Sequence, residues 1–274
     1  MFILLLGARL LANEHASLPP EQRYIRCAEV HPIERGKELK LVICMTMKMA
    51  LHLLQAKRLS IDTSFKRAQG WQEFEIESWD VDHMRCKWIF FPYHTCSYCY
   101  LAVVGARAFT TSQTAKAHVI LFQRIFEIAS ADTGLPIMFN HIHGAGFETI
   151  IADSHKGQGL GLGMYCVQLS RSVTMQCVYE PERRICDLNP YDHLRRFFRI
   201  CVAHYKRNVL ALRTHVPQDV FTAMLSLATS EHHPNLEATL NIIRNGGPKA
   251  LGWKLCCSFL SMSLIYSFTS MAQG

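Results

Sequence analysis

The sequence has no hydrophobic run of the length expected for a membrane-spanning helix. Such a helix needs about 20 consecutive apolar residues, whereas the apolar run near the C-terminus, 255–268, has 14. The apolar N-terminus resembles a signal peptide, but it lacks a basic leading segment and Arg9 interrupts it. We therefore expect an ordinary N-terminal segment and no stable membrane association. The tail at 251–274 leaves membrane tethering open as a third class of function.

Two further patterns are missing. The eleven cysteines are odd in number and irregularly spaced, which argues against a disulfide framework and favours a reducing compartment. The glycine-rich segment 157–163 lacks both the Gly-Lys-Ser/Thr ending of a P-loop and the downstream acid of a Rossmann motif. Its glycines are better explained by a helix that packs closely against a sheet.

Acidic residues are fewer than basic ones: the chain has 22 Asp and Glu and 29 Lys and Arg, which gives a net charge of +7. This excess permits contact with nucleic acid or an anionic membrane without requiring either. Hydrophobic residues make up 49% of the chain and charged residues 19%, which is typical of a globular protein with a large core.

Hydrophobic periodicity predicts an α/β fold. After an irregular lead-in over 13–40 and a helix over 40–57, three strands are expected within 59–68, 73–78 and 103–109. The glutamates of the second strand are expected on a wet face. A helix over 111–131 follows, then strands at 137–142 and 149–153, the glycine-rich helix, and a strand at 174–179. Three consecutive strands fit an antiparallel meander, and later strands linked by helices fit parallel additions.

The C-terminal half is expected to be helical. Asn189 caps a helix that begins at Pro190, and its apolar face continues to Leu212. Two more helices begin with Pro217 and Pro234. The predicted fold is thus a mixed sheet of five or six strands flanked by helices, followed by a C-terminal helical segment. The predicted division is a lead-in at 1–39, a domain at 40–215 with an insert at 87–102, a helical extension at 216–250, and an apolar, atypical tail at 251–274.

Two acids occupy strand positions. Asp62 lies in the middle of a predicted strand, and Asp153 ends the apolar run 149–152. A carboxylate in a sheet is costly unless it has a partner, a hydrogen bond or a metal. Because both strands are expected in one sheet, we predict that the two acids meet.

Two other groups of residues suggest a function. The 87–102 segment contains Cys96-x-x-Cys99, with His83, Cys86 and His94 nearby, but no second metal-binding pair follows, so the sequence does not favour zinc at Cys96 and Cys99. The predicted helix over 195–213 is basic. Its cations predict either a solvated face or a nucleic-acid-facing surface. They are Arg195, Arg196, Arg199, Lys206, Arg207 and Arg213.

Four ordered motifs resemble the transposase domain of Mutator-like elements, a DDE transposase family, in the form found in basidiomycete transposon-derived proteins. The motifs are Asp62-Thr-Ser-Phe-Lys, Val104-Gly-Ala-Arg-Ala-Phe, Ala152-Asp153-Ser-His-Lys-Gly-Gln-Gly-Leu-Gly, and Cys201-Val-Ala-His204-Tyr-Lys-Arg-Asn208. The resemblance covers 40–250. It implies a ribonuclease-H-like fold and metal-dependent phosphoryl transfer on DNA.

The resemblance makes Asp62 and Asp153 the first two catalytic acids and ligands of Mg²⁺ or Mn²⁺. His204, with Cys201 and Asn208, is then a site or structural residue. The family's third acid has no counterpart in matching text, since Glu231 and Glu237 lie elsewhere. We therefore expect a truncated, inactive transposase-derived protein, nuclear or cytoplasmic, with DNA as partner. The alternative is a non-catalytic DNA-binding or interaction protein that uses the basic helix 195–213.

Overall fold

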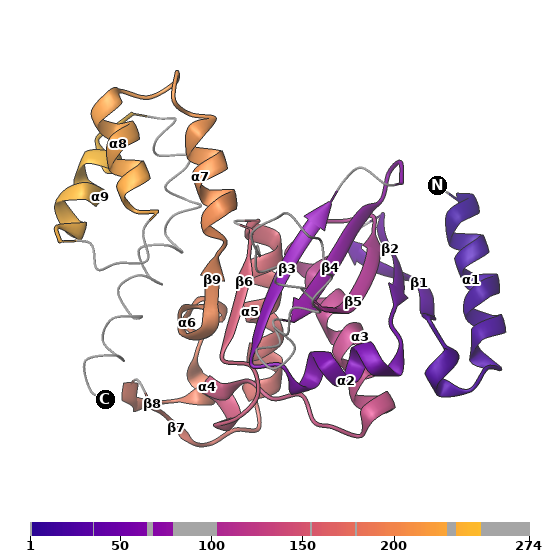
Figure 1. Ribbon diagram of the computed structural model, residues 1–274. Helices are drawn as coiled ribbons and strands as arrows, with labels where there is room; N and C mark the ends of the chain where they lie inside the picture. Colours follow the sequence, from indigo (N-terminus) through magenta and orange to yellow (C-terminus); the bar gives the residue numbers. More distant parts are fainter. Residues whose placement is uncertain are drawn as a thin grey trace, which may run out of the picture. The chain divides into compact units, whose positions relative to one another are not determined.

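The computed structural model describes residues 2–34, 36–64, 68–78, 103–153, 155–178, 180–228 and 234–247. They divide into two compact units, and Figure 1 labels their helices and strands. The first unit comprises Met1–Gln113 and Ile120–Thr149, and the second comprises Thr114–Val119 and Ile150–Gly274. The division passes through one helix, α3 (Ala115–Thr133), whose first turn belongs to the second unit.

The described part of the first unit contains a five-stranded antiparallel sheet in the order β1-β2-β5-β4-β3. The strands are β1 (Ile25–Glu34), β2 (Lys37–Cys44), β3 (Arg58–Ser64), β4 (Gln72–Ser78) and β5 (Val103–Thr110). The helical segments are α1 (Phe2–Ala16), η1 (Pro20–Gln22), α2 (Met47–Gln55), most of α3, and α4 (Asn140–His143). The three-stranded meander predicted from the sequence is confirmed as β3, β4 and β5.

The irregular lead-in predicted for 13–40 is wrong, as is the start of the helix at 40. Strands β1 and β2 occupy this region, and the helix α2 begins only at Met47. In β2, Leu41, Val42 and Ile43 are all buried, so the strand is covered on both faces and reads as a continuous apolar run that resembles a helix. Pro32 is compatible with β1 because that strand ends the sheet order and has an irregular register there.

One face of this sheet packs on α3. Phe74 of β4 and Phe122 of α3 meet edge to face with ring centroids 5.6 Å apart, and both are fully buried. Phe126 extends the same aromatic core to Phe147, 5.6 Å away. Aromatic pairs of this kind add about 0.5–1.5 kcal/mol beyond the burial of their area. The predicted helix at 111–131 is thus confirmed as α3, and its apolar stripe forms the centre of the first unit's core.

The opposite face of the sheet is covered at its β1–β2 end by α1, which lies beside β1 (Figure 1). Leu5 of α1 clusters with Val42, Cys44 and Trp71, all of them buried. Arg9 fixes the helix by donating from Nε to the carbonyl oxygen of Ala28 at 3.1 Å. The apolar N-terminus therefore serves as a packed helix of the first unit.

The strand predicted at 137–142 is wrong. Residues Asn140–His143 form the short helix α4, and Phe139 makes only an isolated bridge to Phe147. The turn is stabilised locally, because the backbone N–H of Phe139 donates to Nδ1 of His143 at 3.0 Å. Gly144 then ends the helix in the left-handed region, at φ 74°, which a glycine adopts without steric cost.

The second unit contains a parallel strand pair, an antiparallel hairpin and several helices. Its strands are β6 (Thr149–Ala152), β7 (Gln176–Cys177), β8 (Glu180–Arg184) and β9 (Phe198–Ile200). Its helical segments are α5 (Lys156–Ser170), η2 (Ile185–Asp187), α6 (Pro190–Phe197), α7 (Val202–Leu210), α8 (Gln218–Ser226) and α9 (Leu236–Arg244). Strand β6 is the predicted Asp153 strand, and it pairs in parallel with β9. The strand predicted at 174–179 is reduced to the two residues of β7.

The single long helix predicted from Pro190 is wrong beyond Phe197. Asn189 does cap α6, with its side chain accepting from the N–H groups of Tyr191 and Asp192. The chain then becomes extended as β9, because Phe198 and Ile200 are buried where they pair with β6. A new helix, α7, begins at Val202. The basic residues over 195–213 are therefore distributed over two helices, a strand and a turn.

The glycines of α5 allow close packing, but chiefly against two helices and not against a sheet as predicted. A Cβ atom at Gly161 would lie 2.5 Å from Cβ of His118 on the first turn of α3, and one at Gly163 would lie 2.5 Å from the carbonyl oxygen of Pro190. A Cβ at Gly159 would meet only the Phe198 ring of β9, at 3.5 Å. The helix is thus pressed against two other helices, in addition to its contact with the strand.

The protein is an α/β protein. The strands of the first unit pair antiparallel, and the second unit has one parallel pair, β6 with β9, and one antiparallel pair, β7 with β8, with helices packed around them. Within the described ranges, none of the helices is both long and apolar enough to cross a membrane.

Candidate functional site

Two of the sequence motifs meet at the carboxyl ends of β6 and β9. Asp153 directly follows β6, and Cys201 directly follows β9. The backbone N–H of Cys201 donates to the carbonyl oxygen of Ala152 at 2.7 Å, which continues the parallel ladder by one residue. In open α/β sheets, ligands bind outside the carboxyl ends of the strands, so this edge is the candidate site of the second unit.

The Asp153 carboxylate lies at the start of α5 and is half-buried. Its Oδ1 accepts the backbone N–H of His155 at 3.4 Å. His155 is the N-cap of α5, and its Nδ1 accepts the N–H of Gln158 at 3.3 Å. This contact requires a lone pair on Nδ1, so the neutral imidazole carries its proton on Nε2.

A second imidazole lies beside His155. The His118 ring is buried, with its centroid 5.8 Å from that of His155. Its Nδ1 faces the carbonyl oxygen of Thr114 at 3.0 Å, and because a carbonyl only accepts, Nδ1 carries the proton. Neutral His118 therefore presents a lone pair at Nε2, and neutral His155 presents a proton there. The sequence did not indicate His118, since a histidine within an amphipathic helix carries no functional signal by itself.

Helices α5 and α7 both begin at this edge. The first-turn N–H groups of a helix carry a partial positive charge that favours anions. Cys201, the N-cap of α7, and His204, on its first turn, are both half-buried. Asn208 lies one turn further along α7 and is exposed. The four predicted residues Asp153, Cys201, His204 and Asn208 therefore belong to one strand-end region and the helix that leaves it.

Asp62 belongs to the first unit, in the middle of β3, and it is exposed. In the sheet register Asp62 is opposite Glu75, and Glu75 is opposite Arg107. Directly opposed residues share a face of the sheet. Asp62 is therefore part of a charged row that crosses three strands.

The expectation that the β4 glutamates form a wet face is wrong for Glu73, which is 4% exposed. Arg107 contacts two of these glutamates, with Nε 3.2 Å from Oε1 of Glu73 and 2.6 Å from Oε1 of Glu75. Burial raises the pKa of the third, Glu77, and the negative charges of Glu75 and Asp62 raise it further. Together, Asp62 and the three glutamates of β4 thus form a partly desolvated acidic face, and Arg107 is its counter-charge.

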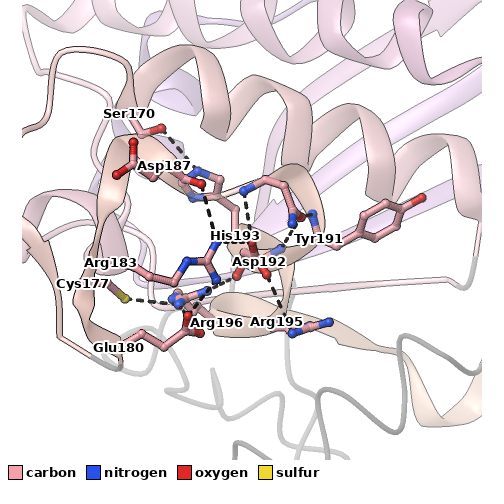
Figure 2. Close-up of polar contacts among 11 residues, drawn as sticks. Ser170, Cys177, Glu180, Arg183, Asp187, Tyr191, Asp192, His193, Arg195 and Arg196 are labelled. Atoms are coloured by element: carbon pink, nitrogen blue, oxygen red, sulfur yellow. Dashed lines mark hydrogen bonds and ion pairs between the residues drawn. The ribbon is translucent and has the colours of Figure 1, made fainter.

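The arginines of α6 belong to an ion-pair network with the β7–β8 hairpin (Figure 2). Arg196 has a side chain that is 5% exposed, with Nη2 2.9 Å from Oε1 of Glu180 and 3.2 Å from Sγ of Cys177. Arg183 of the hairpin places Nη2 2.7 Å from Oδ2 of Asp192. Arg195 lies 3.7 Å from the other oxygen of Asp192. These contacts attach the hairpin to α6.

Beneath this network lies a buried histidine. His193 is fully buried, and its Nε2 lies 3.3 Å from Oγ of Ser170 (Figure 2). Burial, and then the positive charge of Arg196, lower the pKa of His193 to about 4, while the charge of Asp192 opposes the shift. Because Ser170 is also fully buried, this pair packs α5 against α6 and does not face a substrate.

The remaining predicted cations differ in environment. Arg199 of β9 donates from Nη1 to the backbone carbonyl oxygens of Phe198 at 2.9 Å and Arg195 at 3.3 Å. Lys206 and Arg207 are exposed on α7. The four arginines and one lysine predicted as one DNA-binding set, Arg195, Arg196, Arg199, Lys206 and Arg207, are therefore divided by the structure into a network on α6, a strand residue and an exposed pair.

Several sequence predictions lie outside the described residues. These are the zinc candidates Cys96 and Cys99 with their neighbours His83, Cys86 and His94, the insert 87–102, the acid Glu231 and the tail 251–274. Glu237 is described: it lies on the first turn of α9 and pairs with Arg244. In the part of the chain that the structure describes, no three His, Cys, Asp or Glu side chains are grouped so as to hold a metal ion.

Comparison with known proteins gives no match. No protein-family model, curated protein sequence or solved structure matches this chain.

Proposed function

We propose that this chain is a transposase-derived protein of ribonuclease-H-like fold that keeps two acids of a metal-dependent, DNA-cleaving site and is catalytically incomplete. The proposal depends chiefly on one observation: the motifs at Asp153 and Cys201 are adjacent at the ends of two parallel strands, joined by the 2.7 Å Ala152–Cys201 hydrogen bond. The resemblance links these two motifs only by their order in the sequence.

The order of elements supports the proposal. An antiparallel meander, β3 to β5, has an acid in the middle of its first strand. A helix, α3, leads from it to the parallel strand β6, whose end carries the second acid. A second helix, α5, precedes β9. This is the strand and helix order that the resemblance to DDE transposases implies for Asp62 and Asp153.

The donor chemistry fits a hard divalent cation at each acid. Carboxylate oxygens are the ligands that Mg²⁺ and Mn²⁺ prefer, and Asp62 is an exposed carboxylate. A pair of such ions supplies activation of the attacking oxygen and stabilisation of the leaving oxygen when bound. Because two acids are present and no third lies in a segment that matches the family's motif, we propose weak metal binding and little strand-transfer activity.

The test is Mn²⁺ binding, measured by electron paramagnetic resonance on the full chain and its variants. We expect Asp62→Asn and Asp153→Asn each to weaken binding by about 10-fold or more, the scale seen when a metal site loses an important group. The matched control is Asp219→Asn, which removes an exposed carboxylate on the first turn of α8 and should leave Mn²⁺ affinity unchanged.

Equal affinity in the parent, Asp62→Asn and Asp153→Asn would refute the proposed site. Nicking of supercoiled DNA in Mn²⁺ separates the two parts of the proposal. We expect no nicking above the Asp62→Asn background. Nicking that disappears in Asp62→Asn would keep the enzyme class and overturn the proposed incompleteness.

A further inference from the structure

A stretch of the second unit is unusually cationic. Residues 193–218 contain six Lys or Arg and no Asp or Glu. From the sequence alone, all six are expected to lie on one basic helix. The structure shows that they belong to two separate groups.

The residues of the first group make ion pairs and hydrogen bonds within the protein. Arg195 and Arg196 pair with Asp192 and Glu180, which precede the acid-free stretch. Arg199 donates to two backbone carbonyl oxygens of its own segment. A cation that is already paired with a carboxylate neutralises a phosphate poorly, because the existing contact has to be given up.

The second group comprises Lys206, Arg207 and Arg213. Lys206 and Arg207 lie on α7, and Arg213 lies in the turn that follows, all of them exposed. None of the three makes an ion pair within the described ranges, in contrast to Arg195 and Arg196.

The packing of α7 fixes which way this group faces. Tyr205 is 4% exposed and Val209 fully buried. The Tyr205 hydroxyl donates to the carbonyl oxygen of Met224 in α8 at 2.8 Å. With this side of α7 held against α8, the adjacent Lys206 and Arg207 project to solvent. Backbone hydrogen bonds from Leu212 to Val209 and from Arg213 to Leu210 continue the turns beyond the helix.

We propose that α7 and the turn after it form a cationic surface, Lys206, Arg207 and Arg213, that contacts the phosphate backbone of duplex DNA. The surface does not include Arg195, Arg196 or Arg199. This inference takes its class of partner from the proposed function, but it needs neither metal binding nor catalysis. Contacts to phosphates alone carry no sequence information, so the binding is sequence-indifferent.

A membrane surface is the weaker alternative partner. An interfacial helix needs a continuous apolar face opposite its cations. The large exposed apolar residues of α7 are Val202 and Leu210, at the two ends of the helix, while Tyr205 and Val209 are buried within the second unit. The exposed side is thus cationic without an apolar stripe for insertion.

The experiment measures the affinity of the full chain for a labelled random-sequence DNA duplex, by fluorescence anisotropy across a salt series. Each neutralised phosphate contributes about 0.9 to the slope of log affinity against log salt, so three contacts lower affinity about 40-fold between about 50 and 200 mM salt. We expect the triple variant Lys206→Gln/Arg207→Gln/Arg213→Gln to reduce the slope by roughly 3 and to weaken binding equally for all sequences.

The matched control is Lys48→Gln/Lys116→Gln/Arg171→Gln. It removes the same charge from three other exposed cations, on α2, on α3 and just after α5. We expect a slope close to that of the parent. Equal losses in both triple variants would mean that net charge alone drives binding and would overturn the proposal, as would a parent that binds vesicles of anionic lipid but not DNA.

A separate comparison keeps this inference distinct from the proposed function. Asp62→Asn and Asp153→Asn should retain the DNA affinity of the parent in the absence of divalent metal. If those variants lose Mn²⁺ but keep DNA, while the triple variant Lys206→Gln/Arg207→Gln/Arg213→Gln loses DNA, both proposals stand. If Asp62→Asn and Asp153→Asn leave Mn²⁺ binding unchanged while the triple variant Lys206→Gln/Arg207→Gln/Arg213→Gln loses DNA, only the metal site is refuted.

Discussion

Ala152 and Cys201 are joined by a backbone hydrogen bond of 2.7 Å, which extends the β6–β9 pairing by one residue beyond the Ala152–Ile200 pair. The two residues come from motifs that lie about fifty positions apart in the sequence. Through this bond the acid after β6 and the start of α7 share one edge of the second unit. The proposed function depends on this arrangement.

The first prediction tests this bond by Cys201→Pro. Cys201 has φ −62°, which proline adopts without strain, and proline has no N–H to donate. The preceding residue, Ile200, is in a strand, as a residue before proline prefers. We expect a loss of about 1–3 kcal/mol from the unsatisfied carbonyl of Ala152, measured by urea denaturation. Cys201→Ala keeps the N–H and is the control; equal losses in both variants would mean that the side chain and not the bond matters.

The second prediction concerns the glycines of α5. Gly161→Ala and Gly163→Ala each place a methyl group 2.5 Å from atoms of a neighbouring helix, and we expect each to lower the thermal midpoint by several degrees, the effect of about 1–3 kcal/mol of overpacking. Gly159→Ala meets an ordinary 3.5 Å contact and should be neutral or stabilising, because alanine favours a helix by about 1 kcal/mol over glycine. A similar increase of the thermal midpoint in all three variants would show that the packing around Gly161 and Gly163 is looser than described.

The sequence was informative where one physical signal dominated. The 3.6-residue apolar stripe of α3, the Asn189-Pro190 start of α6 and the small residues of α5 each correspond to a single structural cause. The structure confirms the first two predictions. For α5 it confirms close packing at the glycines, but the partners are α3 and α6 and not the predicted sheet. The position of Asp153 at a strand end was predicted for the same reason, since a short apolar run ends there.

The sequence misled where one pattern fits two structures. The apolar residues from Leu194 to Val209 keep a helical spacing, yet Phe198 and Ile200 form a strand because β6 supplies a partner for them. Likewise the run Leu41-Val42-Ile43 looks helical but is a strand buried on both faces. Such outcomes depend on tertiary partners, which no local window contains. For the same reason, no local window of sequence could show that Arg196 pairs with Glu180, which lies 16 residues earlier in the chain.

The third prediction is a pH dependence that arises from His193. Its folded-state pKa of about 4 lies below the unfolded value of about 6.5, so below pH 6.5 the unfolded chain binds a proton that the folded chain does not. Stability from this group is therefore fully present above pH 6.5 and is lost as pH falls toward 4. We expect the free energy of unfolding to fall by up to about 1.4 kcal/mol per pH unit, measured by denaturant titration between about pH 5 and 6.5, where most carboxyl groups remain ionised.

The control for this pH dependence is His193→Gln, whose amide nitrogen can take the place of Nε2 opposite Ser170. We expect this variant to be less stable at pH 7 but to have a flatter profile between about pH 5 and 6.5. A profile as steep as that of the parent would assign the effect to other groups.

The fourth prediction concerns the charged row that contains Asp62. Arg107→Met removes the guanidinium that both Glu73 and Glu75 contact, while keeping an apolar side chain of similar length. Because Glu73 is 4% exposed, its charge is costly in the absence of that cation, and we expect a loss on the order of 3 kcal/mol in the free energy of unfolding at pH 7. Lys37→Met breaks the exposed pair with Glu34 and should change stability little. Adding Glu73→Gln to Arg107→Met should restore part of the loss; a double variant less stable than Arg107→Met alone would show that Glu73 is held by contacts other than Arg107.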